Sequence, residues 1–127
     1  FNFNSQISTS RSQSERLLAL GLKRETADMI HSFKQTAHIG DWFILPIYHG
    51  DNRYCKEFIP AWSLDRLMEL VPHRFGEYCD YANNFMYYYN IPFDVMEQFR
   101  GETRYEYLIN CIEWLIKVGY FNKEYLV

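Results

Sequence analysis

Long hydrophobic runs and an excess of basic residues are both missing from this sequence. Its apolar stretches are short, and one of them, Trp42 to Leu45, ends at Pro46. A membrane-spanning helix needs about 20 consecutive apolar residues, so we expect no membrane contact. Only 13 Lys and Arg stand against 16 Asp and Glu, which gives a net charge of −3. Nucleic-acid-binding domains usually carry a basic patch, so this balance argues against a nucleic-acid partner.

Cysteine is scarce, and the three residues present, Cys55, Cys79 and Cys111, show no CxxC spacing. A secreted disulfide framework normally has an even and denser set of cysteines. Reduced, buried thiols are the simpler interpretation, because cysteine outside disulfides is among the most buried residue types. We therefore expect a cytoplasmic protein.

Catalytic signatures are missing as well. The sequence contains no HExxH, GxSxG, P-loop or GxGxxG motif, the patterns typical of zinc proteases, serine hydrolases and nucleotide sites. We therefore predict no catalytic, cofactor-binding or metal-ligating residues and no cofactor. Two alternatives stay open. His49 with Asp51, or His73 with Glu77, would suit a metal site. Cys55 near His49 would suit a thiol nucleophile beside a base.

Helix signals follow a polar start. Residues 1–11 are rich in Ser and Asn, which predicts a polar N-terminal arm. Ser12 and Glu15 have capping-box spacing, so we expect a helix from Ser12. Gly21 then suits the left-handed position after that helix, with apolar Leu22 just beyond it. Apolar residues at i, i+3, i+4 predict a second helix over 23–33.

Two later helices have clear boundaries. Ser63 is a suitable N-cap, and Pro72 stops the apolar stripe that follows it. Thr103 and Glu106 have capping-box spacing, and Gly119 suits the end of the last helix. The stripe of that helix is apolar and consists of Tyr105, Leu108, Ile109, Ile112, Leu115 and Ile116.

Strand signals occur between these helices. Residues 41–48 and 54–59 are aromatic or alternating and predict a first hairpin, with Pro46 marking an edge or a bulge. Residues 77–90 predict a second hairpin around an Asn-Asn pair. Residues 91–102 have an ambiguous pattern, in which 93–99 would suit one or two helical turns before Gly101. The expected fold is therefore α+β: residues 12–127 form a single domain of order α-α-β-β-α-β-β-α, with an antiparallel sheet of about four strands packed against helices.

Three segments carry a family resemblance when they are taken together. They are ERLLALGL leading to ETADM over residues 15–29, IPAWSL leading to LMELVP over residues 59–72, and CIEWL leading to Gly119-Tyr120. The set resembles a group of small uncharacterised proteins of Bacteroides-type gut bacteria, often associated with prophage or mobile elements. The resemblance covers most of the chain from Ser12 onward, and IPAWSL is its most specific part. It implies a cytoplasmic, mobile-element-linked protein and brings no activity with it.

Aromatic residues, at 19% of the chain, are the unusual component. Because neighbours on a strand point to opposite faces, Phe85, Tyr87 and Tyr89 share one face of the second hairpin. We expect one face to pack on helices and the other to present aromatics to a partner. Cross-strand pairing alone is the alternative role for such tyrosines. The predicted interaction surface comprises Trp42, Tyr48, Phe85, Tyr87 and Tyr89.

These observations favour a non-enzymatic protein-interaction or accessory module, one that binds another protein or a second copy of itself. One alternative is a small enzyme that uses a Cys or a His-Asp site. Another is a weak binder of single-stranded nucleic acid that stacks bases on its aromatic side chains.

Overall fold

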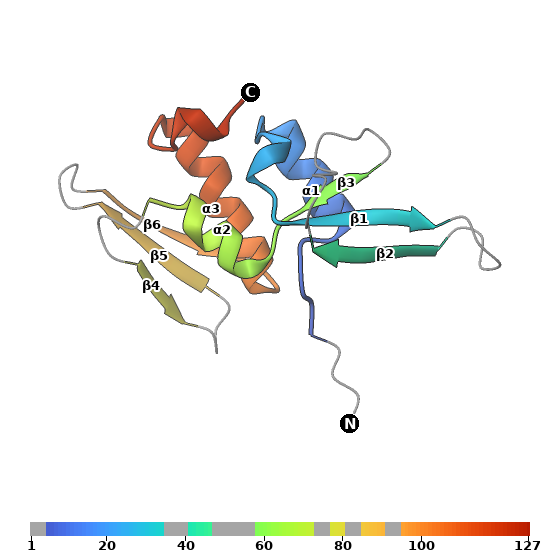
Figure 1. The fold of residues 1–127 in the computed structure, drawn as a ribbon. Coiled ribbons are helices and arrows are strands. Elements are labelled where there is room, and N and C mark those ends of the chain that lie inside the picture. The colour runs from blue at the N-terminus through green and yellow to red at the C-terminus, as the bar shows by residue number, and fades with distance from the viewer. Residues whose placement is uncertain (1–4, 35–40, 47–57, 73–76, 81–84, 91–94) are drawn as a thin grey trace. The chain divides into compact units, whose positions relative to one another are not determined.

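The computed structural model describes residues 5–34, 41–46, 58–72, 77–80, 85–90 and 95–127. Contacts divide the chain into two compact units, Phe1–Arg66 with Val127 and Leu67–Leu126. The first contains α1 (Arg11–Ala19), a 3₁₀ turn η1 (Arg24–Thr26), and strands β1 (Met29–Lys34), β2 (Asp41–Pro46) and β3 (Ile59–Ala61). Helix α2 (Leu64–Leu70) crosses the boundary between the units. The second unit contains β4 (Glu77–Asp80), β5 (Phe85–Asn90), β6 (Val95–Arg100), α3 (Arg104–Val118) and a 3₁₀ turn η4 (Lys123–Tyr125) (Figure 1).

Helix α1 begins two residues earlier than Ser12–Glu15 predicts. The capping box is formed by Ser10, whose hydroxyl accepts from the backbone N–H of Gln13, and by the Gln13 side chain in return. Ser10–Gln13 has the same spacing as the predicted pair Ser12–Glu15, with Gln in place of Glu as the residue that bonds back to the N-cap. The sequence therefore contains two overlapping capping boxes, and the helix begins at the first of them.

The predicted end of α1 is confirmed. Gly21 has φ +102°, and its N–H donates to the Leu18 carbonyl while the N–H of Leu22 donates to Leu17. This is a Schellman motif, and its usual apolar contact is available because Leu17 and Leu22 are both buried.

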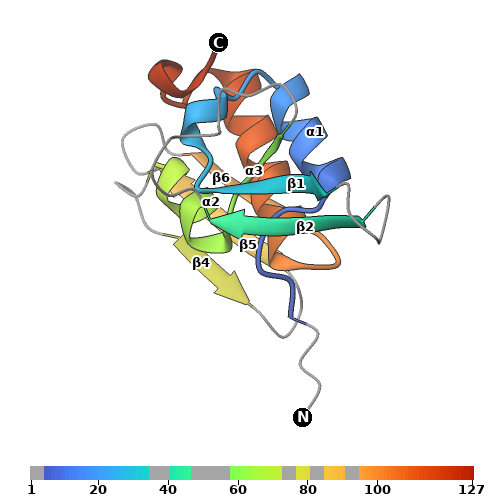
Figure 2. The same cartoon turned by 45° about the vertical axis from the view of Figure 1, so that its right-hand side comes forward.

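The predicted helix over residues 23–33 is wrong. Only one 3₁₀ turn forms, and Met29–Lys34 is a strand. Strand β1 is central in an antiparallel sheet of order β2-β1-β3 (Figure 1), and Figure 2 shows β1 and β2 side by side. Ile30 and its neighbour His31 are both buried, so the strand is covered on both faces and shows no alternation in the sequence. Periodicity alone does not separate such a strand from a helix.

The predicted first hairpin is also wrong in its pairing. Strand β2 confirms the strand at residues 41–48, but it pairs with β1, from Met29 opposite Pro46 to Lys34 opposite Asp41. Strand β3 lies on the other side of β1. The two prolines, Pro46 and Pro60, are therefore both on edge strands, where a missing N–H donor is tolerated. Most of the expected strand at 54–59 lies outside the described residues.

The second sheet has the order β4-β5-β6 and is antiparallel throughout. It confirms the hairpin at residues 77–90, whose Asn-Asn turn lies outside the described part of the chain. The helical turns predicted over 93–99 are wrong, because Val95–Arg100 is strand β6. Gln98 and Arg100 are exposed and Phe99 is buried, which is the period of a strand.

Helix α3 lies against one face of this sheet (Figure 1). The Thr103 hydroxyl accepts from the N–H of Glu106, and Gly119 ends the helix at φ +83°, as predicted. The buried side of α3 is wider than the predicted stripe. It comprises Tyr105, Tyr107, Leu108, Ile109, Cys111, Ile112 and Leu115.

The mixed α+β class is therefore confirmed, and the single sheet of about four strands is not found. The described residues form two sheets of three strands each, and the element order differs from α-α-β-β-α-β-β-α. One domain over residues 12–127 stays a prediction.

Candidate functional site

The two faces of β5 differ sharply in burial, as the strand alternation predicts. Met86 and Tyr88 are 0% and 1% exposed. The Tyr88 ring meets the Trp114 ring of α3 edge-on, with 6.0 Å between centroids. Phe85 and Tyr87 are only half-buried and belong to the opposite face. One face of the sheet therefore packs on α3, and the other carries aromatic side chains away from that helix.

Four side chains on the outer side of β5 and β6 form what we call the aromatic–arginine face: Phe85, Tyr87, Gln98 and Arg100. The Phe85 and Tyr87 rings meet at 82° with centroids 5.3 Å apart. In the register Phe85 is opposite Arg100, and Tyr87 is opposite Gln98. Directly opposed residues share a face of an antiparallel sheet.

The Arg100 guanidinium is held over the Phe85 ring, with Cζ 5.3 Å from the ring centroid. The Gln98 side chain adds a second restraint. With its amide oriented so that oxygen faces the guanidinium, that oxygen accepts from Nη2 at 2.9 Å and from Nε at 3.3 Å. A cation over an aromatic face is attracted by the ring quadrupole. The arginine is thus positioned in advance although it is exposed to solvent.

The backbone beneath this arginine is fixed to α3. The Asn110 side chain donates to the Arg100 carbonyl at 2.7 Å. The chain then turns at Gly101, where an added Cβ would lie 2.5 Å from the Glu106 Cβ and 2.7 Å from the Tyr107 nitrogen. Glycine is therefore required for the close approach of the β6–α3 turn to the helix.

The predicted surface residues are only partly brought together. Phe85 and Tyr87 are in direct contact. Trp42 is on β2, opposite Phe33, and so belongs to the other sheet. Tyr48 lies outside the described residues. Tyr89 is on β5 opposite Met96, and its side chain is not among those described.

Sequence reasoning missed Gln98 and Arg100. Gln98 lies in the segment 93–99 that suits helical turns and Arg100 directly follows it, so a strand register with Phe85 and Tyr87 is not expected from the sequence. The alternation of polar Gln98, apolar Phe99 and polar Arg100 is the signal in the sequence that indicates a strand here.

A second arrangement that sequence reasoning missed is a buried polar cluster in the first unit. Thr9 is fully buried, and its N–H donates to the Trp62 carbonyl at 2.8 Å. Its hydroxyl accepts from the Trp62 N–H at 3.1 Å and lies 2.8 Å from the Ser14 hydroxyl. Its carbonyl accepts a hydrogen bond from Nε2 of His31 at 2.8 Å.

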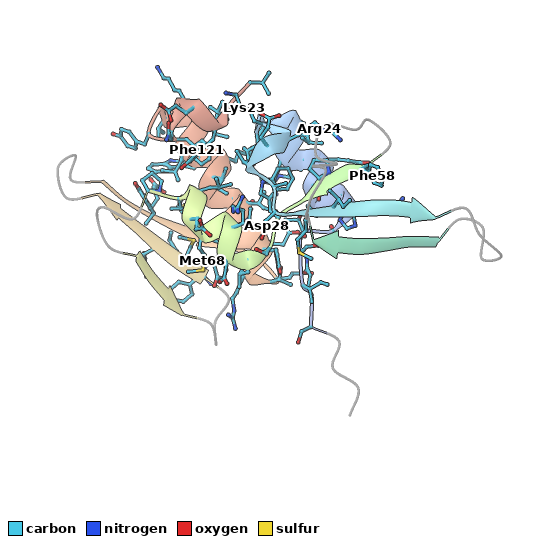
Figure 3. All side chains as sticks on the ribbon, viewed as in Figure 1. Lys23, Arg24, Asp28, Phe58, Met68 and Phe121 are labelled. Carbon is cyan, nitrogen blue, oxygen red and sulfur yellow. The ribbon has the colours of Figure 1, made fainter. Side chains whose placement is uncertain are left out.

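Trp62 itself confirms the interpretation of the IPAWSL segment as a strand-to-helix junction. Its side chain is 0% exposed, and its indole N–H donates to the Thr26 hydroxyl at 3.0 Å. Thr26 belongs to the turn η1, and two further hydrogen bonds join η1 to residues 58–66. Arg66 donates to the Thr26 carbonyl at 2.9 Å, and Arg24 donates to the Phe58 carbonyl. Figure 3 labels Arg24, Asp28 and Phe58 around this loop.

His31 is the titratable member of the buried cluster and is 4% exposed. Burial lowers the pKa of His31 from its ordinary value of 6.5. The hydrogen bond to Thr9 acts in the opposite direction, and the positive charge of Arg11 lowers the pKa further. The desolvation of the charged ring is the largest of these effects, so the neutral form is favoured.

Most residues of the enzymatic alternative lie outside the described part of the chain. Among those residues no group of three or more His, Cys, Asp or Glu side chains is arranged to hold a metal ion. Cys111 is buried in α3. The pairs His49–Asp51 and His49–Cys55 lie outside the described residues, and so does His73 of the pair with Glu77. The same part of the chain holds no helix long and apolar enough to cross a bilayer.

No protein-family model, curated protein or solved structure matches this chain.

Proposed function

We propose that this chain is a non-enzymatic protein-interaction module that binds its partner through the aromatic–arginine face. The observation that carries the proposal is the Arg100 guanidinium held over the half-buried Phe85 ring, beside Tyr87. Aromatic residues and arginine are the types enriched at protein interfaces and at their energetic hot spots. Side chains that are already positioned lose less conformational entropy when they bind.

The resemblance of residues 59–64 to mobile-element proteins supports a wider proposal. The module works in the bacterial cytoplasm as an accessory of a prophage or mobile element. Its partner is another protein of that element or a second copy of the chain. Light scattering separates these two partners, because self-association gives the isolated protein a mass above 15.4 kDa.

Site-specific photo-crosslinking tests the face directly. A photo-reactive phenylalanine is placed at Tyr87 in one version of the full chain and at exposed Glu113 of α3 in a control version. We expect a discrete adduct from position 87 in Bacteroides-type cells and its loss with Arg100→Ala. Circular dichroism checks that Arg100→Ala remains folded. Equal adducts from both positions, or none from position 87, would contradict the proposal.

Single-stranded nucleic acid is the second candidate partner. One observation favours it: Phe85 and Tyr87 share a face of the central strand β5, and Arg100 lies beside them on β6. Bases stack on such side chains, whereas backbone binding needs a basic groove. Filter binding of a single-stranded oligonucleotide at low salt tests it: retention that Tyr87→Ala and Arg100→Ala both reduce would favour it over a protein partner.

A further inference from the structure

The segment Gln6–Ser10 docks into the first unit through hydrogen bonds that centre on Thr9. Ser8 and Thr9 are 1% and 0% exposed, whereas Ile7 is 57% exposed. Thr9 uses its backbone N–H and its hydroxyl to satisfy both backbone polar groups of Trp62. A polar segment with little apolar burial is held mainly by its hydrogen bonds, and its local opening is therefore sensitive to each of them.

His31 supplies a further hydrogen bond of this docking site, in addition to those that Thr9 makes with Trp62 and Ser14. It lies on the central strand β1 and donates from Nε2 to the Thr9 carbonyl at 2.8 Å. Protonation of the ring would add a proton at Nδ1 and place a full positive charge in a site that is 4% exposed. An ion in such a site is costly unless it is paired.

Among the described residues, none that acts on the His31 ring carries a compensating negative charge. The residues opposite His31 in the register are apolar, Ile44 on β2 and Ile59 on β3. Arg11, at the start of α1, acts on the ring with a charge of the same sign. Helix α1 also carries the ionisable residues Glu15 and Arg16. Among the strands, Asp41 on β2 is opposite Lys34 on β1, and β3 has no ionisable residue.

We propose that His31 operates a proton-controlled latch, in which protonation of its ring releases the segment Gln6–Ser10 from Trp62. Opening hydrates the charged ring and removes it from its buried site. In the closed state the neutral ring holds Thr9 through Nε2–H. The latch is independent of the proposed partner binding at the aromatic–arginine face.

The pKa of His31, lowered by burial and by Arg11, sets the pH range of the latch. Acidification should raise the ratio of open to closed protein. The total rise is about tenfold for each unit by which the pKa of His31 is lower in the closed state than in the open state. Release also uncovers the backbone N–H and carbonyl of Trp62, next to the edge strand β3.

NMR of the full chain tests the latch by following the amide of Thr9 and the ring of His31 between pH 7.5 and pH 5. We expect protection of the Thr9 amide from hydrogen exchange, corrected for the intrinsic pH dependence, to fall at the same midpoint at which His31 titrates. Constant protection through that titration would overturn the proposal, and so would a His31 ring that titrates at 6.5 or above.

Two variants separate the latch from a general loss of structure. Arg11→Gln should shift the midpoint upward, whereas Arg16→Gln, which removes the same charge from the last turn of α1, should shift it less. His31→Gln keeps an N–H donor for Thr9 without a titrating ring and should make Thr9 protection independent of pH. The Arg11→Gln variant retains His31, so its change in midpoint still tests the latch if His31→Gln does not fold. An unchanged midpoint in Arg11→Gln counts against the proposal.

Discussion

Ser63 donates both its backbone N–H and its hydroxyl to the carboxylate of Asp28, at 2.8 Å and 2.5 Å. The same hydroxyl accepts from the N–H of Arg66 at 3.2 Å, the bond expected of an N-cap. The Ser63 side chain therefore caps the N-terminus of α2, and it also joins the segment after β3 to Asp28, the residue before β1.

Asp28→Ala should destabilise the first unit, because it leaves the Ser63 N–H and hydroxyl without their acceptor in a half-buried site. We expect a loss of about 1–3 kcal/mol in the free energy of unfolding, measured by urea titration. Glu15→Ala, at an exposed position of α1, is the matched control and should change stability by less than about 0.5 kcal/mol. Equal stability of the two variants would show that the Asp28–Ser63 pair is not stabilising.

Gly101→Ala should destabilise the second unit for a steric reason. The added Cβ would overlap the Glu106 Cβ and the backbone nitrogen of Tyr107, and helix backbone cannot easily move. Overpacking of this kind costs about 1–3 kcal/mol. Thermal unfolding measures the effect, and a melting temperature equal to that of the wild type would contradict the close approach of the β6–α3 turn.

Gly119→Ala tests a different cause, because an added Cβ at this position meets no atom within 4 Å. The cost comes from φ +83°, a conformation that costs an L-residue about 1–2 kcal/mol. Gly119→Asn should lose less stability than Gly119→Ala, since asparagine tolerates left-handed backbone better. The reverse order in urea unfolding would exclude this explanation.

Ile112→Asp should unfold the second unit. Ile112 is 0% exposed on the side of α3 that carries the buried stripe, and an unpaired carboxylate there has no compensation. Glu113→Gln, at the next and exposed position, controls for altered helix charge. Reversible melting of Ile112→Asp at the wild-type temperature would contradict the placement of Ile112 in the core.

The stability of the protein should fall as the pH is lowered from about 7 to about 5. The unfolded chain protonates His31 near pH 6.5, whereas the folded protein does so only at lower pH because burial lowers the pKa. The unfolded state therefore binds more protons in this window, so acid favours unfolding. Urea midpoints at several pH values measure the effect. The slope should flatten in His31→Gln, and parallel declines in both proteins would show that other groups are responsible.

Helix ends could be predicted from the sequence because the interactions that make them are local. Gly21 and Gly119 adopt the left-handed backbone expected of them, and Ser63 and Thr103 accept from the N–H three residues ahead. Such signals span only a few residues, so they need no knowledge of the rest of the chain.

Strands β1 and β6 could not be predicted from the sequence. Strand β1 pairs with β3, which is remote in the sequence, and the polar and apolar pattern of β6 also suits a helix. Ile30 and His31 are buried on opposite faces of a central strand, which removes the alternation that marks a strand. For the candidate site, the shared face of Phe85 and Tyr87 followed from alternation alone. The place of Arg100 over Phe85 depends on the register of β5 with β6, which no local signal sets.

The hydrogen bonds between Thr9 and Trp62 join residues 53 positions apart, and this separation imposes an order on synthesis. The β1–β2 pairing needs no residue beyond Pro46, so it can form while the ribosome is still adding the next part of the chain. Residues 8 and 9 emerge before these strands and yet have no binding site until Trp62 has left the exit tunnel. The segment around Thr9 is thus made before β1 and β2 and is still among the last parts of the first unit to reach its place.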